Sequence, residues 1–139
     1  HHLTPAQLKA MLRAKGLERS LVVSDTVTLG GLPAGKYHTP IGGKVELKAD
    51  GFLAIDDGTG NYLAGASLPM TAAIPVLVNQ VGLTLGEAIT LLTAAPGRIV
   101  GGRGVLAVGQ PADLMAFHWD GSMVRPEVGG VWLLGRSVA

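Results

Sequence analysis

A short apolar run, Leu21-Val22-Val23, leads into Ser24 and Asp25 and is followed by a glycine-rich stretch. Continuous runs of branched apolar residues this short are typical of strands buried on both faces of a parallel sheet. A helix is predicted just before the run, because Thr4-Pro5 is a favoured start and Lys15-Gly16 a favoured end. A helix followed by a buried strand is half of a βαβ unit, so the sequence predicts an α/β fold with a strand over 21–25.

Local signals predict the remaining elements. Glycines and prolines between residues 30 and 43 indicate a long loop or a pair of tight turns. After this loop we expect a half-buried strand over 44–48, a turn at 50–51 and a return strand over 52–55. We then expect a helical segment over 70–81 with a kink or a boundary at Pro75, a helix from Thr84 to residue 97, and strands over 114–119 and 131–134.

The composition excludes several classes of protein. Only 15% of the 139 residues are charged, against about 25% in typical domains, whereas 47% are hydrophobic. We therefore expect one flank to pack against other protein, as in a piece of a larger fold. The net charge of +1 argues against nucleic acid and anionic membranes as partners. No apolar run is long enough to span a membrane, and cysteine is absent, which excludes disulfides and thiol chemistry.

Asp25 is the strongest candidate for chemistry. It stands at the carboxyl end of the predicted buried strand, where parallel α/β folds build their active sites. A carboxylate there can bind a metal ion or take a proton from an attacking water. The alternative is that Asp25 caps the next turn through its side chain, and position alone leaves both roles open.

The histidines give weaker signals. His2 precedes a helix N-terminus, where N–H groups attract anions, although a frayed chain end is the simpler interpretation. His38 falls in the predicted loop, and His118 falls in a predicted strand as a surface or packing residue. The sequence has no H-x-H or H-E-x-x-H spacing and no phosphate-binding glycine motif, so neither a metal site nor a phosphate loop follows from local spacing.

Four segments in order resemble N-acetylglucosamine-6-phosphate deacetylases of the amidohydrolase superfamily. They are residues 21–37 (LVVSDTVTLGGLPAGKY), 63–70 (LAGASLPM), 85–98 (LGEAITLLTAAPGR) and 104–114 (GVLAVGQPADL). The last is specific only to the superfamily, whereas the first two favour the deacetylases. The resemblance runs over nearly the whole chain.

The resemblance implies a fold and a division of the chain. Those enzymes are metal-dependent (β/α)8 barrels with a small β-sandwich, and this chain is similar to their C-terminal part. Residues 1–100 would be the last barrel units, with a helix, the strand ending at Asp25, a β-hairpin insertion and closing helices. Residues 101–139 would be strands of the β-sandwich.

The resemblance also implies site residues. Asp25 matches the general base and acid, and His2, Leu63, Ala64 and Gly65 match residues that contact the substrate. The cofactor would be a divalent metal ion, zinc or iron, with ligands upstream of residue 1 and Asp25 as a possible ligand. The stretch 27–30 departs from the family's A-P-A-G pattern, and Ala66 replaces a serine, which loosens the substrate assignment.

The expected function is therefore hydrolysis of N-acetylglucosamine-6-phosphate to glucosamine-6-phosphate and acetate, with these residues inactive by themselves. The resemblance implies an amino-sugar phosphate and the remaining barrel segment as partners, in a cytoplasmic homodimer. Two alternatives stay open. One is another amidohydrolase, acting on a cyclic amide, an N-acyl amino acid or a nucleobase. The other is a non-catalytic, β-rich interaction module.

Overall fold

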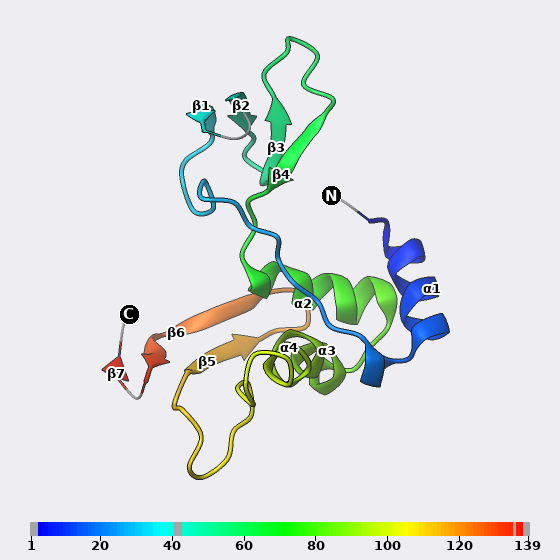
Figure 1. The fold of residues 1–139 in the computed structure, drawn as a ribbon, viewed down its shortest axis with the longest axis vertical. Helices are drawn as coiled ribbons and strands as arrows, with labels where there is room; N and C mark the ends of the chain where they lie inside the picture. The colour runs from blue at the N-terminus through cyan, green and yellow to red at the C-terminus, as the bar shows by residue number, and fades with distance from the viewer. Residues whose placement is uncertain (1–2, 41–42, 135, 138–139) are drawn as a thin grey trace. The chain divides into compact units, whose positions relative to one another are not determined.

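The computed structural model describes residues 3–40, 43–134 and 136–137. The chain divides into two compact units (Figure 1). Residues 23–70 form the first, which we name the central unit. Residues 3–22 together with those from 71 onward form the second, the flanking unit. Helices and sheets are both present, which confirms an α/β composition.

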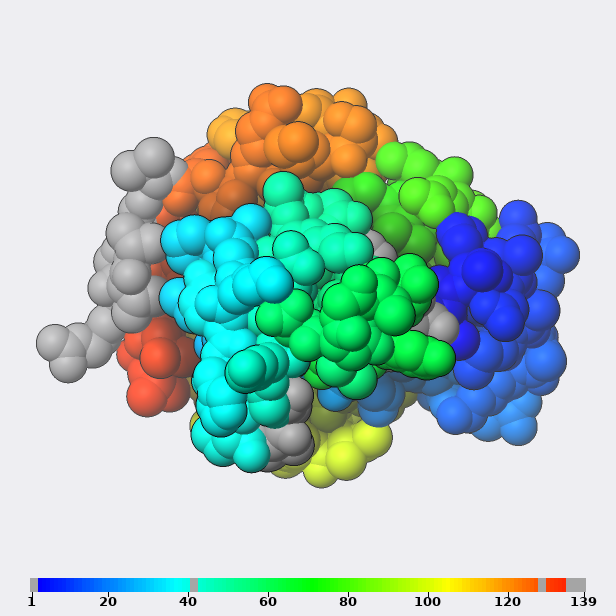
Figure 2. Space-filling model, turned by 90° about the horizontal axis from the view of Figure 1, so that it is seen from above, coloured from blue at the N-terminus to red at the C-terminus, as the bar shows by residue number. Residues whose placement is uncertain are grey.

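The central unit is a four-stranded antiparallel sheet with the strand order β1-β2-β3-β4. Its strands are β1 (Gly35–Thr39), β2 (Gly43–Leu47), β3 (Phe52–Ile55) and β4 (Leu63–Ala66). Leu29, Val45, Leu47 and Leu53 form its core, because alternate residues of a strand point to the same face. In the space-filling view the residues of the four-stranded sheet, cyan to green, face the viewer (Figure 2).

Local patterns predicted part of this sheet. The expected strands over 44–48 and 52–55 are confirmed as β2 and β3, joined by a turn in which Gly51 donates to the Lys48 carbonyl. Strand β1 lies where a loop was predicted, because pairing with β2, Tyr37 opposite Val45, stabilises a segment flanked by turn residues. Strand β4 pairs with β3 in the same way.

The expected buried strand over 21–25 is not formed. Leu21 and Val23 are 37% and 63% exposed, and Asp25 is exposed as well. A buried parallel strand requires hydrogen-bonded neighbours on both edges. In the described part of the chain, one parallel bridge, from Thr26 to Ala66, is all that this region contributes to a sheet.

The flanking unit begins with helices whose starts the sequence predicts well. The helix expected from Thr84 to residue 97 is not continuous, because the backbone of Thr93 (φ -126°, ψ -79°) interrupts it after Leu92. Thr4 and Thr84 each form a capping box, with Gln7 and Glu87 as the reciprocal partners. The helical elements are α1 (Pro5–Lys15), η1 (Leu17–Arg19), η2 (Met70–Ala72, which starts in the central unit), α2 (Ala73–Pro75), η3 (Val76–Val81), α3 (Leu85–Leu92) and α4 (Ala94–Gly97). Their core consists of Leu12, Leu77, Val81, Ala88 and Leu91. Among the described residues, no helix is both long and apolar enough to cross a membrane.

The predicted helix over 70–81 is irregular. It consists of a 3-10 turn, one α-helical turn ending at Pro75 and a π-helical stretch up to Val81. Proline lacks the N–H that an α-helix needs from each interior residue, so a change of helix type beside Pro75 is expected. Gly82 then ends the stretch in the left-handed conformation with φ 88°.

A second antiparallel sheet follows the helices, with strands β5 (Leu114–Trp119), β6 (Val124–Leu133) and β7 (Arg136–Ser137). The predicted strand over 114–119 is confirmed, whereas β6 begins seven residues before the predicted start at 131. Asp113 holds this sheet together at one end. Its carboxylate accepts a bond from the Leu134 amide at 2.8 Å and pairs with Arg103 at 3.0 Å.

The chain between α4 and β5 forms a loop whose two ends lie very close together at Gly97 and Gly104, and we name this close approach the neck of the loop. A Cβ atom on Gly97 would lie 1.7 Å from the Arg103 carbonyl oxygen, and one on Gly104 would lie 2.3 Å from the Thr93 carbonyl oxygen. The Gly102 amide also donates to the Gly97 carbonyl at 2.7 Å. Glycine at both positions is therefore what lets the loop close on the start of α4.

Candidate active site

Asp25 occupies an unusual backbone conformation in the central unit. Its φ is 52°, in the left-handed region that non-glycine residues rarely adopt. The side chain is exposed, and no hydrogen bond or ion pair engages its carboxylate within the described residues. The turn-capping bond considered for Asp25 is made by its neighbour, because the Ser24 hydroxyl accepts from the Thr26 amide at 3.3 Å.

Two predicted site segments, distant in the sequence, lie side by side. The Thr26 hydroxyl donates to the Leu68 carbonyl at 2.5 Å, 42 residues away, and the Val27 amide donates to the Ala66 carbonyl at 2.8 Å. These bonds attach the Asp25 segment to the end of β4. Strand β4 contains Leu63, Ala64 and Gly65, which the resemblance assigns to the substrate.

Gly65 shows how closely the two segments approach each other. Its φ is 138°, and a Cβ atom there would lie 2.9 Å from Cγ1 of Val27. A larger residue would therefore push Val27 away and disturb the segment that follows Asp25. Leu63 and Ala64 are half-buried in the same strand.

A pocket of about 470 Å³ adjoins the Asp25 segment within the central unit. It is lined by Thr26, Val27, Thr28, Thr39, Pro40, Val45, Leu53 and Ala64. Its volume is in the range of small-molecule sites, and its wall combines apolar side chains with threonines. Val27 and Thr28 line this pocket, and both belong to the stretch 27–30 that departs from the family's A-P-A-G pattern. Motif spacing did not identify them as site residues, whereas their departure from the pattern was a signal that could have done so.

The histidines contribute little to this geometry. His2 lies outside the described residues. His38 is exposed on β1, and His118 is exposed on β5 in the flanking unit, where its Nε2 lies 3.2 Å from Glu127. No group of three or more His, Cys, Asp or Glu side chains that could hold a metal ion occurs among the residues that the structure describes.

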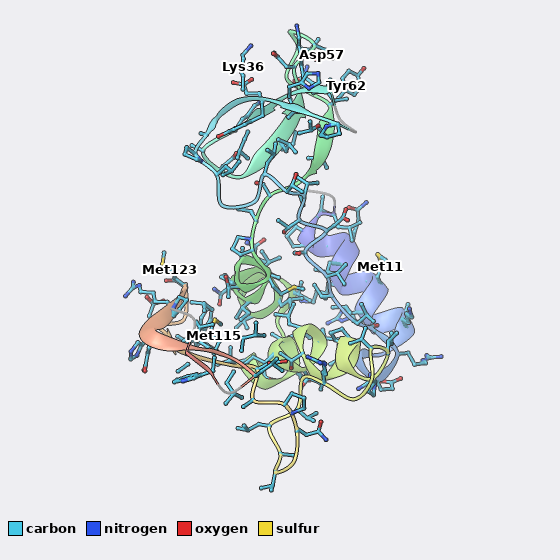
Figure 3. The ribbon with its side chains drawn as sticks, turned by 60° about the vertical axis from the view of Figure 1, so that its left-hand side comes forward. Met11, Lys36, Asp57, Tyr62, Met115 and Met123 are labelled. Atoms are coloured by element: carbon cyan, nitrogen blue, oxygen red, sulfur yellow. The ribbon has the colours of Figure 1, made fainter. Side chains whose placement is uncertain are left out.

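The charged groups at the 56–62 end of the central sheet are occupied by local contacts. Lys36, Asp57 and Tyr62 are found at this end (Figure 3). Lys36 forms a 2.9 Å ion pair with Asp56, whose hydrogen bond raises the pKa of the lysine. The backbone N–H of Thr59 lowers the pKa of the Asp57 carboxyl. The Asp57 bonds are those of an ordinary turn, and the Lys36–Asp56 pair links β1 to the end of β3, so neither marks a second reactive centre.

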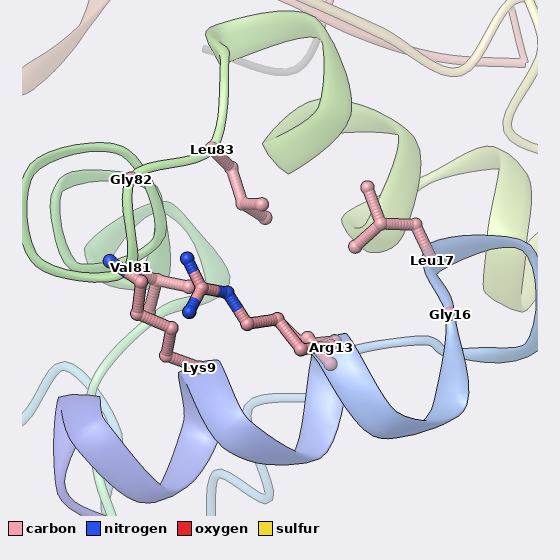
Figure 4. A pocket seen from close by; sticks show the side chains of 8 residues that line it. Lys9, Arg13, Gly16, Leu17, Val81, Gly82 and Leu83 are labelled. Atoms are coloured by element: carbon pink, nitrogen blue, oxygen red, sulfur yellow. The ribbon is translucent and has the colours of Figure 1, made fainter.

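The flanking unit has a smaller pocket of about 280 Å³ between α1 and the 81–83 turn (Figure 4). Lys9 and Arg13 reach across it toward this turn. Nζ of Lys9 lies 3.7 Å from the place of a Cβ on Gly82, at the C-terminal end of η3. A cation is favourable at a helix C-terminus, so these side chains have a structural explanation. None of the predicted site residues lines this pocket.

Comparison with known proteins adds the decisive observation. No protein-family model matches the sequence. Two curated relatives from Escherichia coli strains are each 31% identical to the chain over 111 residues, which is 80% of this chain. They are named a putative N-acetylgalactosamine-6-phosphate deacetylase and an N-acetylgalactosamine-6-phosphate deacetylase. The chain is similar to amino-sugar-phosphate deacetylases. This confirms the resemblance that the motifs indicated.

Solved structures of deacetylases share the fold. The N-acetylglucosamine-6-phosphate deacetylase of Pasteurella multocida matches 96% of this chain with a TM-score of 0.79 and 24% identity. That of Mycobacterium smegmatis matches 99% with a TM-score of 0.80 and 23% identity. Another structure of the Mycobacterium smegmatis protein, a mutant in complex with N-acetyl-D-glucosamine-6-phosphate, matches 97% with a TM-score of 0.78. Both units therefore have counterparts in the deacetylase fold.

The chain is shorter than the deacetylases that it matches. It spans 63% and 28% of the length of the two curated relatives. It spans 33% and 35% of the Pasteurella and Mycobacterium chains. The deacetylase similarity therefore describes one part of a larger fold.

Proposed function

We propose that this chain is the C-terminal segment of an enzyme that hydrolyses the acetamide of N-acetylglucosamine-6-phosphate, giving glucosamine-6-phosphate and acetate. The names of the relatives and the order of the motifs support this activity. The observation that carries the proposal is the Asp25 carboxylate. It is exposed, has no partner among the described residues, and stands on a segment bonded to the end of β4.

Asp25 would act as general base and then as general acid. Its carboxylate takes a proton from the water that attacks the acetamide carbonyl, and the new C–O bond forms as the carbonyl becomes tetrahedral. The protonated carboxyl then gives the proton to the amine nitrogen, the C–N bond breaks, and acetate and the free amine leave. Leu63, Ala64 and Gly65 would contact the sugar phosphate, partly through their backbone, together with His2.

The described residues do not fit a complete metal site. They offer one unpartnered carboxylate at the site and no cluster of three ligands. The resemblance implies a divalent metal ion, zinc or iron, so its ligands would have to come from outside the described residues.

The larger architecture belongs to the same proposal. Residues 1–100 would complete a (β/α)8 barrel and residues 101–139 would contribute to a β-sandwich, in a homodimeric cytoplasmic enzyme. The exposed apolar side chains of Ile99, Leu106 and Val108, at 73%, 86% and 106% exposure, support burial against further protein. By themselves these 139 residues would be inactive, because one carboxylate lacks the partners that hydrolysis requires.

The test uses the full-length protein that carries this chain, with Asp25→Asn. We expect kcat for acetate release to fall by about 10²–10⁴, because general acid–base catalysis contributes on that order, while KM changes little. Asp56→Asn is the matched control, since it removes a carboxylate from the same unit that is paired with Lys36. Near-normal turnover of Asp25→Asn would refute the assigned role.

The substrate requires its own comparison. The two curated relatives are named for the galactosamine compound, whereas the solved structures are named for the glucosamine compound. Acetate release from both N-acetylated sugar phosphates should therefore be measured side by side. Turnover of hydantoins, N-acyl amino acids or nucleobases instead would favour another amidohydrolase. No turnover of any of these substrates would favour a non-catalytic module.

A further inference from the structure

The position of the Asp25 carboxylate depends on its backbone. The side chain has no hydrogen-bond or ion-pair partner within the described residues, so none of these residues orients the carboxylate directly. Its left-handed backbone, with φ 52°, belongs to a sparsely populated region that persists only where the surroundings hold it. The residue that holds this conformation therefore controls where the carboxylate points.

Thr26 makes the contacts that hold it. Its amide donates to Ser24 on the other side of Asp25, at 3.3 Å, which closes the turn around that residue. Its hydroxyl donates to the Leu68 carbonyl at 2.5 Å. Asp25 thus lies inside a short turn whose far end is bonded to the stretch after β4.

The methyl group of the Thr26 side chain also makes a close contact. Cγ2 lies 2.4 Å from the place where Gly30 would carry a Cβ atom, so the methyl group occupies the space that this glycine leaves. The backbone of Thr26 also forms the parallel bridge with Ala66. A side chain that carries both a hydroxyl and a methyl group on Cβ satisfies both contacts.

We propose that Thr26 is a positioning residue for Asp25, acting through its hydroxyl bond to Leu68. This inference rests on the proposed function, because it assigns Thr26 a role in that reaction. Thr26 fixes the direction of the Asp25 carboxylate relative to β4, whose residues 63–65 are the expected substrate contacts. Loss of the bond does not remove the Asp25 carboxylate. It frees the backbone of Asp25 to relax from the left-handed region toward negative φ values, which changes the direction of the carboxylate.

The test compares two substitutions of Thr26 in the full-length protein. Thr26→Val keeps the shape and removes the hydroxyl, whereas Thr26→Ser keeps the hydroxyl and removes the methyl group. We expect Thr26→Val to lower kcat about 10- to 100-fold, because a misplacement of about 1 Å has an effect of that order, with little change in KM. Thr26→Ser should retain kcat within a few-fold of the unsubstituted protein.

Thr90→Val is the matched control. The Thr90 hydroxyl also donates to a backbone carbonyl, that of Gly86 at 2.8 Å, but in helix α3 of the flanking unit. It should leave kcat and KM unchanged. If circular dichroism shows that Thr26→Val does not fold, Thr26→Ala replaces it, with the same expected loss of kcat and the same comparison with Thr26→Ser.

A double substitution separates positioning from a general effect on the enzyme. If Thr26 acts through Asp25, Thr26→Val should lower kcat no further in a protein that already carries Asp25→Asn. An equal loss in both backgrounds, or normal kcat for Thr26→Val, overturns the inference while leaving the proposed function intact. Near-normal turnover of Asp25→Asn alone overturns the catalytic role of Asp25, and the role of Thr26 with it, whereas no acetate release by the unsubstituted full-length protein overturns the proposed function.

Discussion

The flanking unit and the central unit are stabilised in different ways. The helices of the flanking unit begin at local capping boxes and enclose a core that spans α1, η3 and α3. In the central unit, the segment with Asp25 has no regular secondary structure and is attached to β4 by bonds that span about 40 residues. Short-range signals thus determine where the helices of the flanking unit begin, whereas long-range pairing determines the candidate site.

Truncation of a core side chain should have the largest effect on stability, and the effect should be confined to the unit that contains the side chain. Leu91→Ala in the flanking unit and Leu53→Ala in the central unit each remove a side chain that is at most 2% exposed. Each should lower the free energy of unfolding by about 2–5 kcal/mol, the usual range for such cavities. Hydrogen exchange followed by mass spectrometry should show faster exchange in the substituted unit only. Equal acceleration in both units would mean that they open together.

Gly65→Ala tests the close approach between β4 and the Asp25 segment. The new methyl group would meet Val27 in a backbone conformation that alanine disfavours, so we expect a loss of about 1–3 kcal/mol. Gly86→Ala in α3 is the control, because a Cβ atom there meets nothing within 4 Å and alanine is the better helix former. The thermal midpoint should fall for the first and stay the same or rise for the second.

Removal of the helix caps should have a smaller effect. Thr84→Ala removes the hydroxyl that accepts the Glu87 amide at 3.2 Å, and should destabilise α3 by about 1 kcal/mol. The measurement is exchange of the amides in the first turn of α3, with Thr90→Ala as a control outside the cap. Unchanged exchange in Thr84→Ala would mean that tertiary packing alone sets the start of this helix.

The smallest expected effect concerns a turn in the flanking unit. Hydrogen bonds from Ser122 and the charge of Arg125 lower the pKa of the Asp120 carboxyl from 3.8 to about 2. A carboxyl with a lowered pKa in the folded state stabilises the fold above the unfolded value, and this contribution is lost as the pH falls from about 4 to about 2. The difference in thermal midpoint between the unsubstituted protein and Asp120→Asn should therefore shrink over that range. A constant difference would contradict the assignment.

The sequence predicted those parts of the fold whose signals are local. Thr4 and Thr84 mark helix starts, and a turn signal joins β2 to β3, because each depends on residues within a few positions of one another. Strand β1 and the early start of β6 were missed, since pairing with a partner strand stabilises them. The strand over 21–25 was predicted from apolar residues that the described part of the chain leaves exposed.

In the candidate site, too, the sequence predicted only what depends on neighbouring residues. Position in the sequence singled out Asp25, and the structure adds that its carboxylate has no partner among the described residues. The contact of Thr26 with Leu68 has no sequence signal, because threonine is common and its partner is a backbone carbonyl 42 residues away. The catalytic role of Asp25 stays a prediction until it is tested.

The narrow neck at Gly97 and Gly104 has a practical consequence for protein engineering. A single added methyl group at either glycine would collide with a carbonyl, whereas a Cβ atom at Gly101 or Gly102, in the loop between them, would meet nothing within 4 Å. Lengthening a flexible loop is cheap, about 0.6 kcal/mol for each doubling. These 139 residues by themselves should therefore tolerate an epitope tag grafted after Val100, whereas Gly97 and Gly104 at the two ends of the loop accept no side chain at all.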